Sequence, residues 1–138
     1  RQKQREIAMA ATLDAISEAD VIVTNPSHFA VALSYAVGTD EAPKVVAKGA
    51  DFMAKKIRER AEESGIIIFE QPQLARALYF TTEINHDIPR ALFEAVAEVI
   101  AYVFKLNSFN GYGKRAKKPN LKIPSEMNFD ESGKKLDE

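Results

Sequence analysis

Two apolar runs separated by a short polar break constrain the fold of this chain more than any other feature. The first run is Val21-Ile22-Val23-Thr24, whose β-branched residues favour a strand. The break is Asn25-Pro26-Ser27-His28, and the second run continues from Phe29 to Tyr35 with its large side chains at every second position. A link this short predicts two neighbouring antiparallel strands.

Helical and strand patterns alternate around this pair, which predicts an α/β fold. We expect helices at residues 1–18, 50–64, 72–80 and about 89–107, with Asp87 as the cap of the last helix and Pro89 in its first turn. Two further strands are expected. The first is residues 44–48, ended by Gly49, and the second is the apolar run 66–69, which we expect to be buried on both faces.

The composition limits the classes of function that this chain can serve. It has 138 residues, enough for one domain, and 46% of them are apolar. The net charge of -1 gives no global reason to expect a nucleic-acid or anionic-membrane partner. The absence of cysteine excludes disulfides and thiolate metal sites, and no run approaches the roughly 18 apolar residues of a membrane-spanning helix. Because the chain opens without Met, we expect it to be a fragment of a longer protein.

The character of the sequence changes after about Asn107. Residues 108–138 combine a basic cluster, two prolines and an acidic, polar end, with few apolar side chains. Such a segment has no core of its own. We therefore expect a flexible C-terminal tail, disordered or lightly docked, that is dispensable for folding.

The Asn25-Pro26 bond is the feature with distinctive chemistry. In most Asn-X sequences the next backbone nitrogen attacks the Asn side chain and closes a succinimide, but proline has no N–H, so that route is closed. The Asn25 side-chain nitrogen can instead attack its own backbone carbonyl. A succinimide forms again, but the Pro26 nitrogen now leaves and the chain is cut.

A fold can accelerate this slow reaction. It can hold the nucleophile at attack distance, direct donors at the developing oxyanion, and strain the turn that proline restricts. His28 can accept a proton from the amide or protonate the departing nitrogen. Thr24 and Ser27 flank the reacting pair and are expected to support it.

Other interpretations of the same residues remain open at this point. Asn-Pro is a common turn dipeptide, and a histidine in a turn is commonly just solvated. A serine protease is a weaker interpretation, because Ser27 and His28 are adjacent and no third partner is marked. His86, with Glu83 and Asp87 nearby, lacks the further ligands of a metal site. We expect no metal and no cofactor.

Four blocks in order resemble the FlhB/YscU family of type III secretion proteins. They cover about residues 1–107, and the tail is more similar to the flagellar members than to the injectisome members. The blocks are Ala19–Leu33, Pro43–Asp51, Pro72–Tyr79 and Glu94–Val103.

The resemblance implies a small mixed four-stranded sheet surrounded by about four helices. It implies three parts: a linker helix at 1–18 from an absent membrane part, an autocleaving cytoplasmic domain at 19–107, and the tail at 108–138. The resemblance implies that Asn25 is the nucleophile, that the nitrogen of Pro26 is the leaving group and that His28 modulates the rate of cleavage. The family usually has threonine at position 27. Serine keeps the hydroxyl, so we expect cleavage to survive.

The family's role implies a single self-cleavage with no external substrate, after which the two pieces stay associated. Cleavage lets the export apparatus switch from rod and hook substrates to filament substrates. The implied partners are export apparatus components, a hook-length control protein, export substrates and chaperones, and the chain's own cleaved fragment. The implied location is the cytoplasmic face of the bacterial inner membrane. Two alternatives remain: a non-cleaving binding module of the export gate, and an injectisome homologue with the same role.

Overall fold

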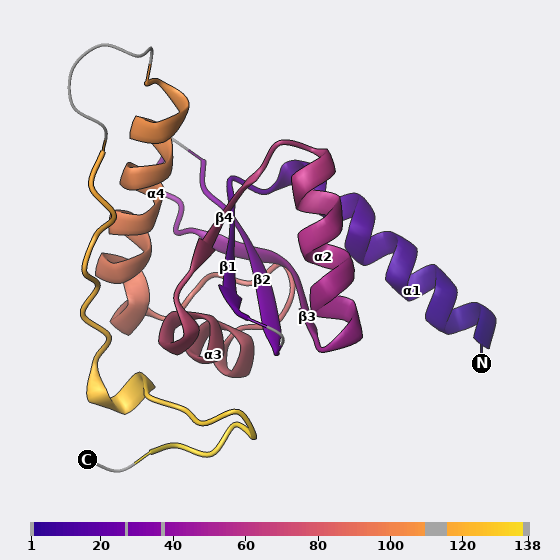
Figure 1. Cartoon of the computed structure of the whole chain (residues 1–138). Helices are drawn as coiled ribbons and strands as arrows, with labels where there is room; N and C mark the ends of the chain where they lie inside the picture. The colour runs from indigo at the N-terminus through magenta and orange to yellow at the C-terminus, as the bar shows by residue number, and fades with distance from the viewer. Residues whose placement is uncertain (1, 27, 37, 110–115, 137–138) are drawn as a thin grey trace.

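A four-stranded mixed sheet forms the centre of the computed structural model (Figure 1). The structure describes residues 2–26, 28–36, 38–109 and 116–136. The strand order is β3-β2-β1-β4, where β1 pairs antiparallel with β2 and parallel with β4, and β2 pairs antiparallel with β3. The strands are β1 (Val21–Asn25), β2 (Phe29–Ser34), β3 (Lys44–Ala50) and β4 (Ile67–Glu70).

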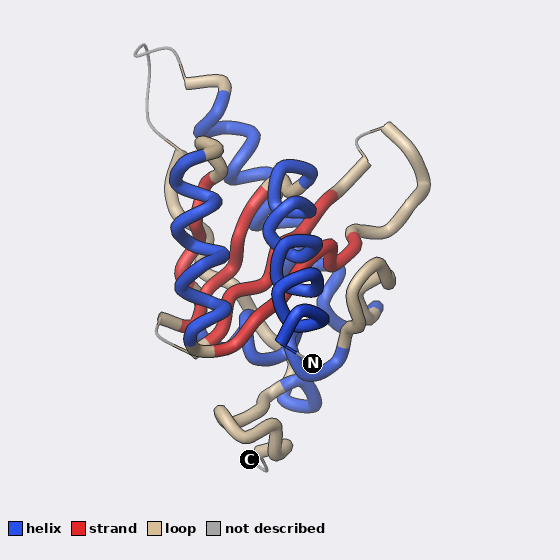
Figure 2. Tube along the Cα trace, turned by 90° about the vertical axis from the view of Figure 1, so that its right-hand side faces the viewer, coloured by secondary structure: helices blue, strands red, loops and turns tan. Residues whose placement is uncertain are grey.

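Helices cover both faces of this sheet, which confirms the predicted fold class. Figure 2 shows the strands lying between them. The α-helices are α1 (Gln2–Ala15), α2 (Phe52–Glu63), α3 (Pro72–Thr81) and α4 (Phe93–Asn107). Short 3-10 turns lie at Ile16–Glu18, Arg90–Leu92 and Ser125–Met127. No helix in the described part of the chain is long and apolar enough to cross a membrane.

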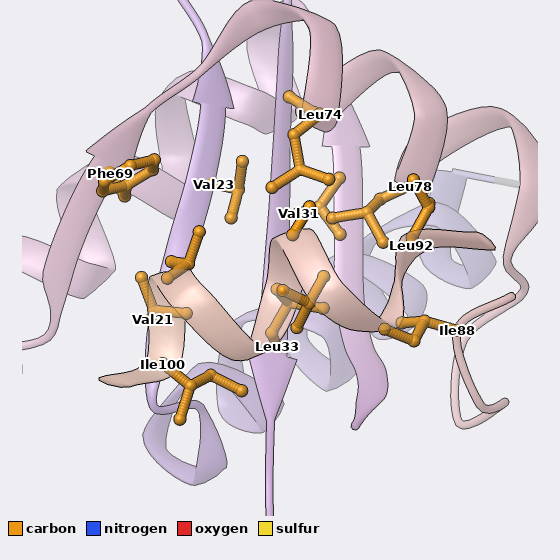
Figure 3. Packing of buried hydrophobic residues seen from close by; sticks show 14 of the residues in the cluster. Val21, Val23, Val31, Leu33, Phe69, Leu74, Leu78, Ile88, Leu92 and Ile100 are labelled. Atoms are coloured by element: carbon orange, nitrogen blue, oxygen red, sulfur yellow. The ribbon is translucent and has the colours of Figure 1, made fainter. Parts of the chain in front are cut away.

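The alternation of side chains along β1 and β2 divides the core into two halves. On one face, the valines and leucine of these strands pack against α3, α4 and the segment leading into α4 (Figure 3). On the other face, Ile22, Ala30 and Ala32 pack against α2 and Ile16. Successive side chains of a strand point to opposite faces of the sheet. A strand that is buried on both faces therefore needs apolar residues at consecutive positions. The two runs of the sequence meet this requirement.

Small residues let α2 approach the sheet closely. A Cβ atom added at Gly49 would lie 2.6 Å from the Met53 Cγ and 3.0 Å from the Ile57 Cδ1. The strand therefore passes directly under the helix at this position. The sequence predicted that β3 ends at Gly49, but β3 continues to Ala50 because Gly49 and Ala50 pair with Ala30 and Phe29 of β2.

Two further expectations from the sequence are wrong in detail. The run around β4 was expected to be buried on both faces, but β4 is an edge strand in which only Phe69 is buried. The last helix was expected to start near Pro89 with Asp87 as its cap. Asp87 instead forms an isolated bridge with Lys44, and a 3-10 turn follows Pro89 before α4 begins at Phe93.

The described part of the C-terminal segment, residues 116–136, is docked on the domain. It runs beside α4 and then below α3 (Figure 1). The Lys118 ammonium lies 5.0 Å from the centre of the Phe69 ring. Four partly buried apolar residues pack against the core on the side of α3 and α4: Leu121, Ile123, Met127 and Phe129. Of the two states expected for the tail, the structure has the docked one.

This docking makes the tail a contributor to stability, contrary to the expectation that it is dispensable. Removing residues 116–138 should lower the free energy of unfolding by about 2–4 kcal/mol, because four apolar side chains lose part of their burial. Phe129→Ala alone should lower it by about 1–3 kcal/mol, whereas Leu136→Ala, at an exposed position, should change it little. Urea unfolding measures all three. Equal stability of the truncated and full-length proteins would contradict the packing.

Candidate functional site

A tight turn joins β1 to β2 and carries the predicted cleavage residues. The last residue of β1, Asn25, is paired in register with the first residue of β2, Phe29. The backbone N–H of His28 donates to the Asn25 carbonyl oxygen at 3.0 Å and closes the turn. The predicted antiparallel pair with its tight link is confirmed. Ser27 lies outside the described residues, so its expected role stays a prediction.

The Asn25 side chain is buried in this turn. The residue is only 6% exposed, and its side-chain nitrogen Nδ2 has no hydrogen-bond partner among the described residues. A buried amide without a partner costs free energy, so such a group needs an explanation. A nitrogen without a partner among the described residues, four covalent bonds from the carbonyl carbon of its own residue, is what closure of a five-membered succinimide ring requires.

The hydrogen bond that closes the turn also acts on the bond that would be cut. The Asn25 carbonyl accepts it, and attack by Nδ2 would convert that oxygen into an oxyanion. A backbone donor at 3.0 Å lies within the range in which such donors stabilise a developing negative charge. The turn therefore places a nucleophile, its electrophile and an oxyanion donor within four residues.

Hydrogen bonds on both sides hold this turn in place. The Thr24 carbonyl accepts from the Gln71 N–H at 3.0 Å, which links the end of β1 to the start of α3. The His28 carbonyl accepts from the Asp51 N–H at 2.8 Å, which links the turn to the start of α2. Thr24 is 2% exposed and is thus a buried anchor for the reacting residue. Its supporting role in cleavage stays a prediction.

The His28 side chain lies between two carboxylates. Its Nδ1 is 3.9 Å from the Asp51 Oδ1, and its Nε2 is 3.2 Å from the Glu131 Oε2. The imidazole is 44% exposed, so it is reachable by solvent and by the C-terminal segment. Sequence reasoning missed both carboxylates. Asp51 falls inside the expected helix 50–64, where nothing marks it as a partner of His28, and Glu131 lies about 100 residues further along the chain.

The backbone of Asp51 is strained. Its φ of 51° and ψ of -112° belong to a region that glycine adopts readily and other residues adopt at a cost of about 1–3 kcal/mol. Two hydrogen bonds hold it there, because its N–H donates to the His28 carbonyl and its own carbonyl accepts from the Lys55 N–H at 3.0 Å. The strained residue therefore lies between the β1–β2 turn and the start of α2.

Two hollows lie at opposite ends of the sheet. One, of about 440 Å³, borders the turn and is lined by residues that include Pro26, Arg58 and Glu70. The other, of about 460 Å³, is mostly apolar and lies between α4 and the loop before β3, with Tyr35 and Phe104 among its lining. Across the described ranges no group of three or more His, Asp or Glu side chains is placed to bind an ion.

A mixed four-stranded sheet with Asn25-Pro26 at the turn between β1 and β2 matches what the resemblance to the FlhB/YscU family implies; Asn25 is buried in this turn and Pro26 is exposed. The comparisons with known proteins agree. Residues 1–103 match the FlhB HrpN YscU SpaS family, and the chain belongs to that family. This confirms the resemblance on which the sequence analysis relied.

Several relatives of this chain carry the name flagellar biosynthetic protein FlhB. The protein from Salmonella typhimurium is 46% identical over 131 residues, which cover 94% of this chain and 34% of that protein. The Bacillus subtilis protein is 46% identical over 105 residues, covering 76% of this chain and 29% of its own length. The chain thus spans about a third of the length of these relatives.

Solved structures share the fold. The cytoplasmic domain of FlhB from Shewanella putrefaciens superposes with a TM-score of 0.81 at 44% identity, covering 88% of this chain and 95% of that one. A mutated EscU C-terminal domain gives 0.65 at 33% identity, covering 68% of this chain and 94% of that one.

The strain at Asp51 can be tested directly. Asp51→Gly should raise the free energy of unfolding by on the order of 1 kcal/mol, because glycine adopts this φ without a Cβ clash. Asn85→Gly is the matched control. Asn85 also has a positive φ, of 70°, a value that asparagine tolerates, so its gain should be smaller. Denaturant unfolding compares the two, and an equal or smaller gain at Asp51 would contradict the strain.

Proposed function

We propose that this chain is the cytoplasmic domain of a type III secretion export-switch protein that cuts its own backbone between Asn25 and Pro26. One observation carries the cleavage proposal. The Asn25 side-chain nitrogen is buried and has no hydrogen-bond partner in the part of the chain that the structure describes, and the carbonyl it would attack already accepts the His28 backbone N–H. Membership of the family supports the assignment.

The reaction proceeds in two steps. The Asn25 Nδ2 attacks the Asn25 carbonyl carbon and loses a proton, while the oxygen takes up negative charge opposite the His28 N–H. The bond from that carbon to the Pro26 nitrogen then breaks, and the nitrogen takes a proton. The products are residues 1–25 ending in a succinimide and residues 26–138 beginning with a secondary amine. Water later opens the succinimide ring.

Each of the three residues has a separate role. Asn25 provides both nucleophile and electrophile. Pro26 has no N–H and so closes the competing backbone attack, and its nitrogen is the leaving group. His28 transfers a proton through its imidazole and supplies the oxyanion donor through its backbone, so replacing its side chain removes only the first contribution.

The two pieces remain associated after the cut. The fragment 1–25 contributes β1, which lies between β2 and β4 with every residue buried. Breaking the turn at the end of β1 leaves both of its ladders and both halves of the core in place. Cleavage thus frees the turn without dissolving the sheet.

We propose that this freed turn lets the flagellar export apparatus change from rod and hook substrates to filament substrates. The flagellar assignment rests on the names of relatives that match 94% of this chain. The proposed partners are other export apparatus components, a hook-length control protein, export substrates and chaperones. The proposed position is the cytoplasmic face of the inner membrane, below a membrane part that lies outside this chain.

Substitution of Asn25 tests the proposed chemistry. Asn25→Ala removes the only nitrogen that can attack this carbonyl, so it should abolish cleavage while keeping the fold. His28→Ala should slow cleavage by about 10²–10⁴-fold, because water replaces a general base only in part. Freshly refolded proteins are followed on a timed denaturing gel. Cleavage of Asn25→Ala at the wild-type rate would assign the cut to an external protease, and an uncut wild type would favour the non-cleaving binding module.

A further inference from the structure

We propose that Glu131, in the C-terminal segment, positions the imidazole of His28 and so sets the rate of cleavage at Asn25. This inference rests on the proposed function. The Glu131 Oε2 lies 3.2 Å from the His28 Nε2, and the Asp51 Oδ1 lies 3.9 Å from Nδ1 on the other side of the ring. Glu131 is thus a positioning residue that acts through His28.

An imidazole at this position needs such a partner to be effective. The His28 side chain is 44% exposed, so without contacts it would sample several rotamers. Carboxylates facing both ring nitrogens restrict the ring and compensate its positive charge after it has accepted a proton. Only Glu131, at 3.2 Å from Nε2, is within hydrogen-bond distance, whereas Asp51 is 3.9 Å from Nδ1. A carboxylate bonded to one ring nitrogen orients the imidazole and leaves the other nitrogen to exchange protons, as in other catalytic histidines.

The loop that carries Glu131 is internally organised. The Asp130 Oδ1 accepts from the Ser132 hydroxyl at 2.7 Å, the Ser132 N–H at 2.9 Å and the Lys134 N–H at 2.9 Å. The Ser132 hydroxyl, with the Lys134 N–H, lowers the pKa of Asp130 below its ordinary value of 3.8. These hydrogen bonds therefore stabilise the loop fully above pH 3.8, and this stabilisation is lost as the pH falls through the lowered pKa of Asp130.

The same loop is anchored on α3. The Arg76 Nε donates to the Phe129 carbonyl at 2.6 Å, and the Phe129 and Phe80 rings lie 6.1 Å apart. Gly133, at a φ of 88°, lies against the Phe80 ring so closely that an added Cβ would be 2.8 Å from two ring carbons. Only glycine fits this contact. Three separate contacts thus fix the loop beside the turn.

Aromatic contacts also connect α3 to the turn between β1 and β2. Phe80 packs edge-on against Phe29 at 5.3 Å between ring centres, and Phe29 directly follows His28. The Tyr79 ring lies 4.5 Å from the same Phe29 ring. The aromatic side chains of α3 therefore contact both the start of β2 and the C-terminal loop. Lifting the loop off α3 would remove Glu131 from His28 and leave β1 and β2 intact.

The test measures cleavage of the full chain with changes at Glu131. Glu131→Gln, which keeps the shape and removes the charge, should slow cleavage by about 10-fold, the lower end of what loss of a supporting partner costs. Gly133→Ala should slow it as well, because its methyl group displaces the loop from Phe80. The matched control is Glu126→Gln, an exposed residue of the same segment, which should cleave at the wild-type rate. In a His28→Ala background, Glu131→Gln should have no further effect.

A spectroscopic readout separates this inference from the cleavage proposal. The chain has two histidines, so in uncleavable Asn25→Ala the imidazole ¹⁵N signals of His28 can be followed beside those of His86 as an internal control. Glu131→Gln should shift the His28 signals alone. Unchanged His28 signals would overturn the inference. So would faster or unchanged cleavage, or equal slowing with and without His28. An uncut wild type would defeat the cleavage proposal and the rate claim together, while a shift of the His28 signals would still establish the contact.

Discussion

The hydrogen-bonded pairing of β1 on both of its edges is the constraint on which the rest of the structure depends. β1 lies between β2 and β4, and its five residues are all buried. This pairing ends at Asn25, where the chain must reverse to form β2. The reversal places a buried asparagine directly before a proline and closes the turn on the asparagine carbonyl. The central strand and the turn proposed to be cut therefore have a common physical origin.

Much of this architecture follows from the sequence. The β-branched run 21–24 and the alternating run 29–35 predict a buried antiparallel pair, because covering both sheet faces demands continuous apolar sequence. The cleavage proposed at Asn25-Pro26 was also inferred from the sequence, because that proposal starts from a side-chain nitrogen and a missing backbone N–H. The apolar run at β4 was ambiguous. The length and composition of a short apolar run do not show whether the strand lies at the centre or at the edge of a sheet. Its position depends on which strands pair with it, and β4 pairs with β1 alone.

The remainder of the candidate site depends on long-range contacts that no local pattern reports. Glu131 reaches His28 only because the C-terminal loop docks on Phe80 of α3. The strained φ of Asp51 arises from hydrogen bonds to the turn and to α2, although aspartate has no preference for that conformation. Docking of the tail uses four apolar residues, Leu121, Ile123, Met127 and Phe129, in a polar segment that belongs to none of the four strands of the sheet. Chain ends that look unstructured in sequence thus complete the surroundings of the turn.

The most direct test of the account is the mass of the fragment 1–25 at the moment of its release. Attack by the Asn25 side-chain nitrogen requires that this fragment first ends in a succinimide. Rapidly quenched samples should therefore contain a species lighter by one water than the hydrolysed fragment, which converts to the hydrolysed mass with time. A fragment that has the hydrolysed mass from its first detection would show that water or a protease cuts the Asn25-Pro26 bond, and would contradict the mechanism.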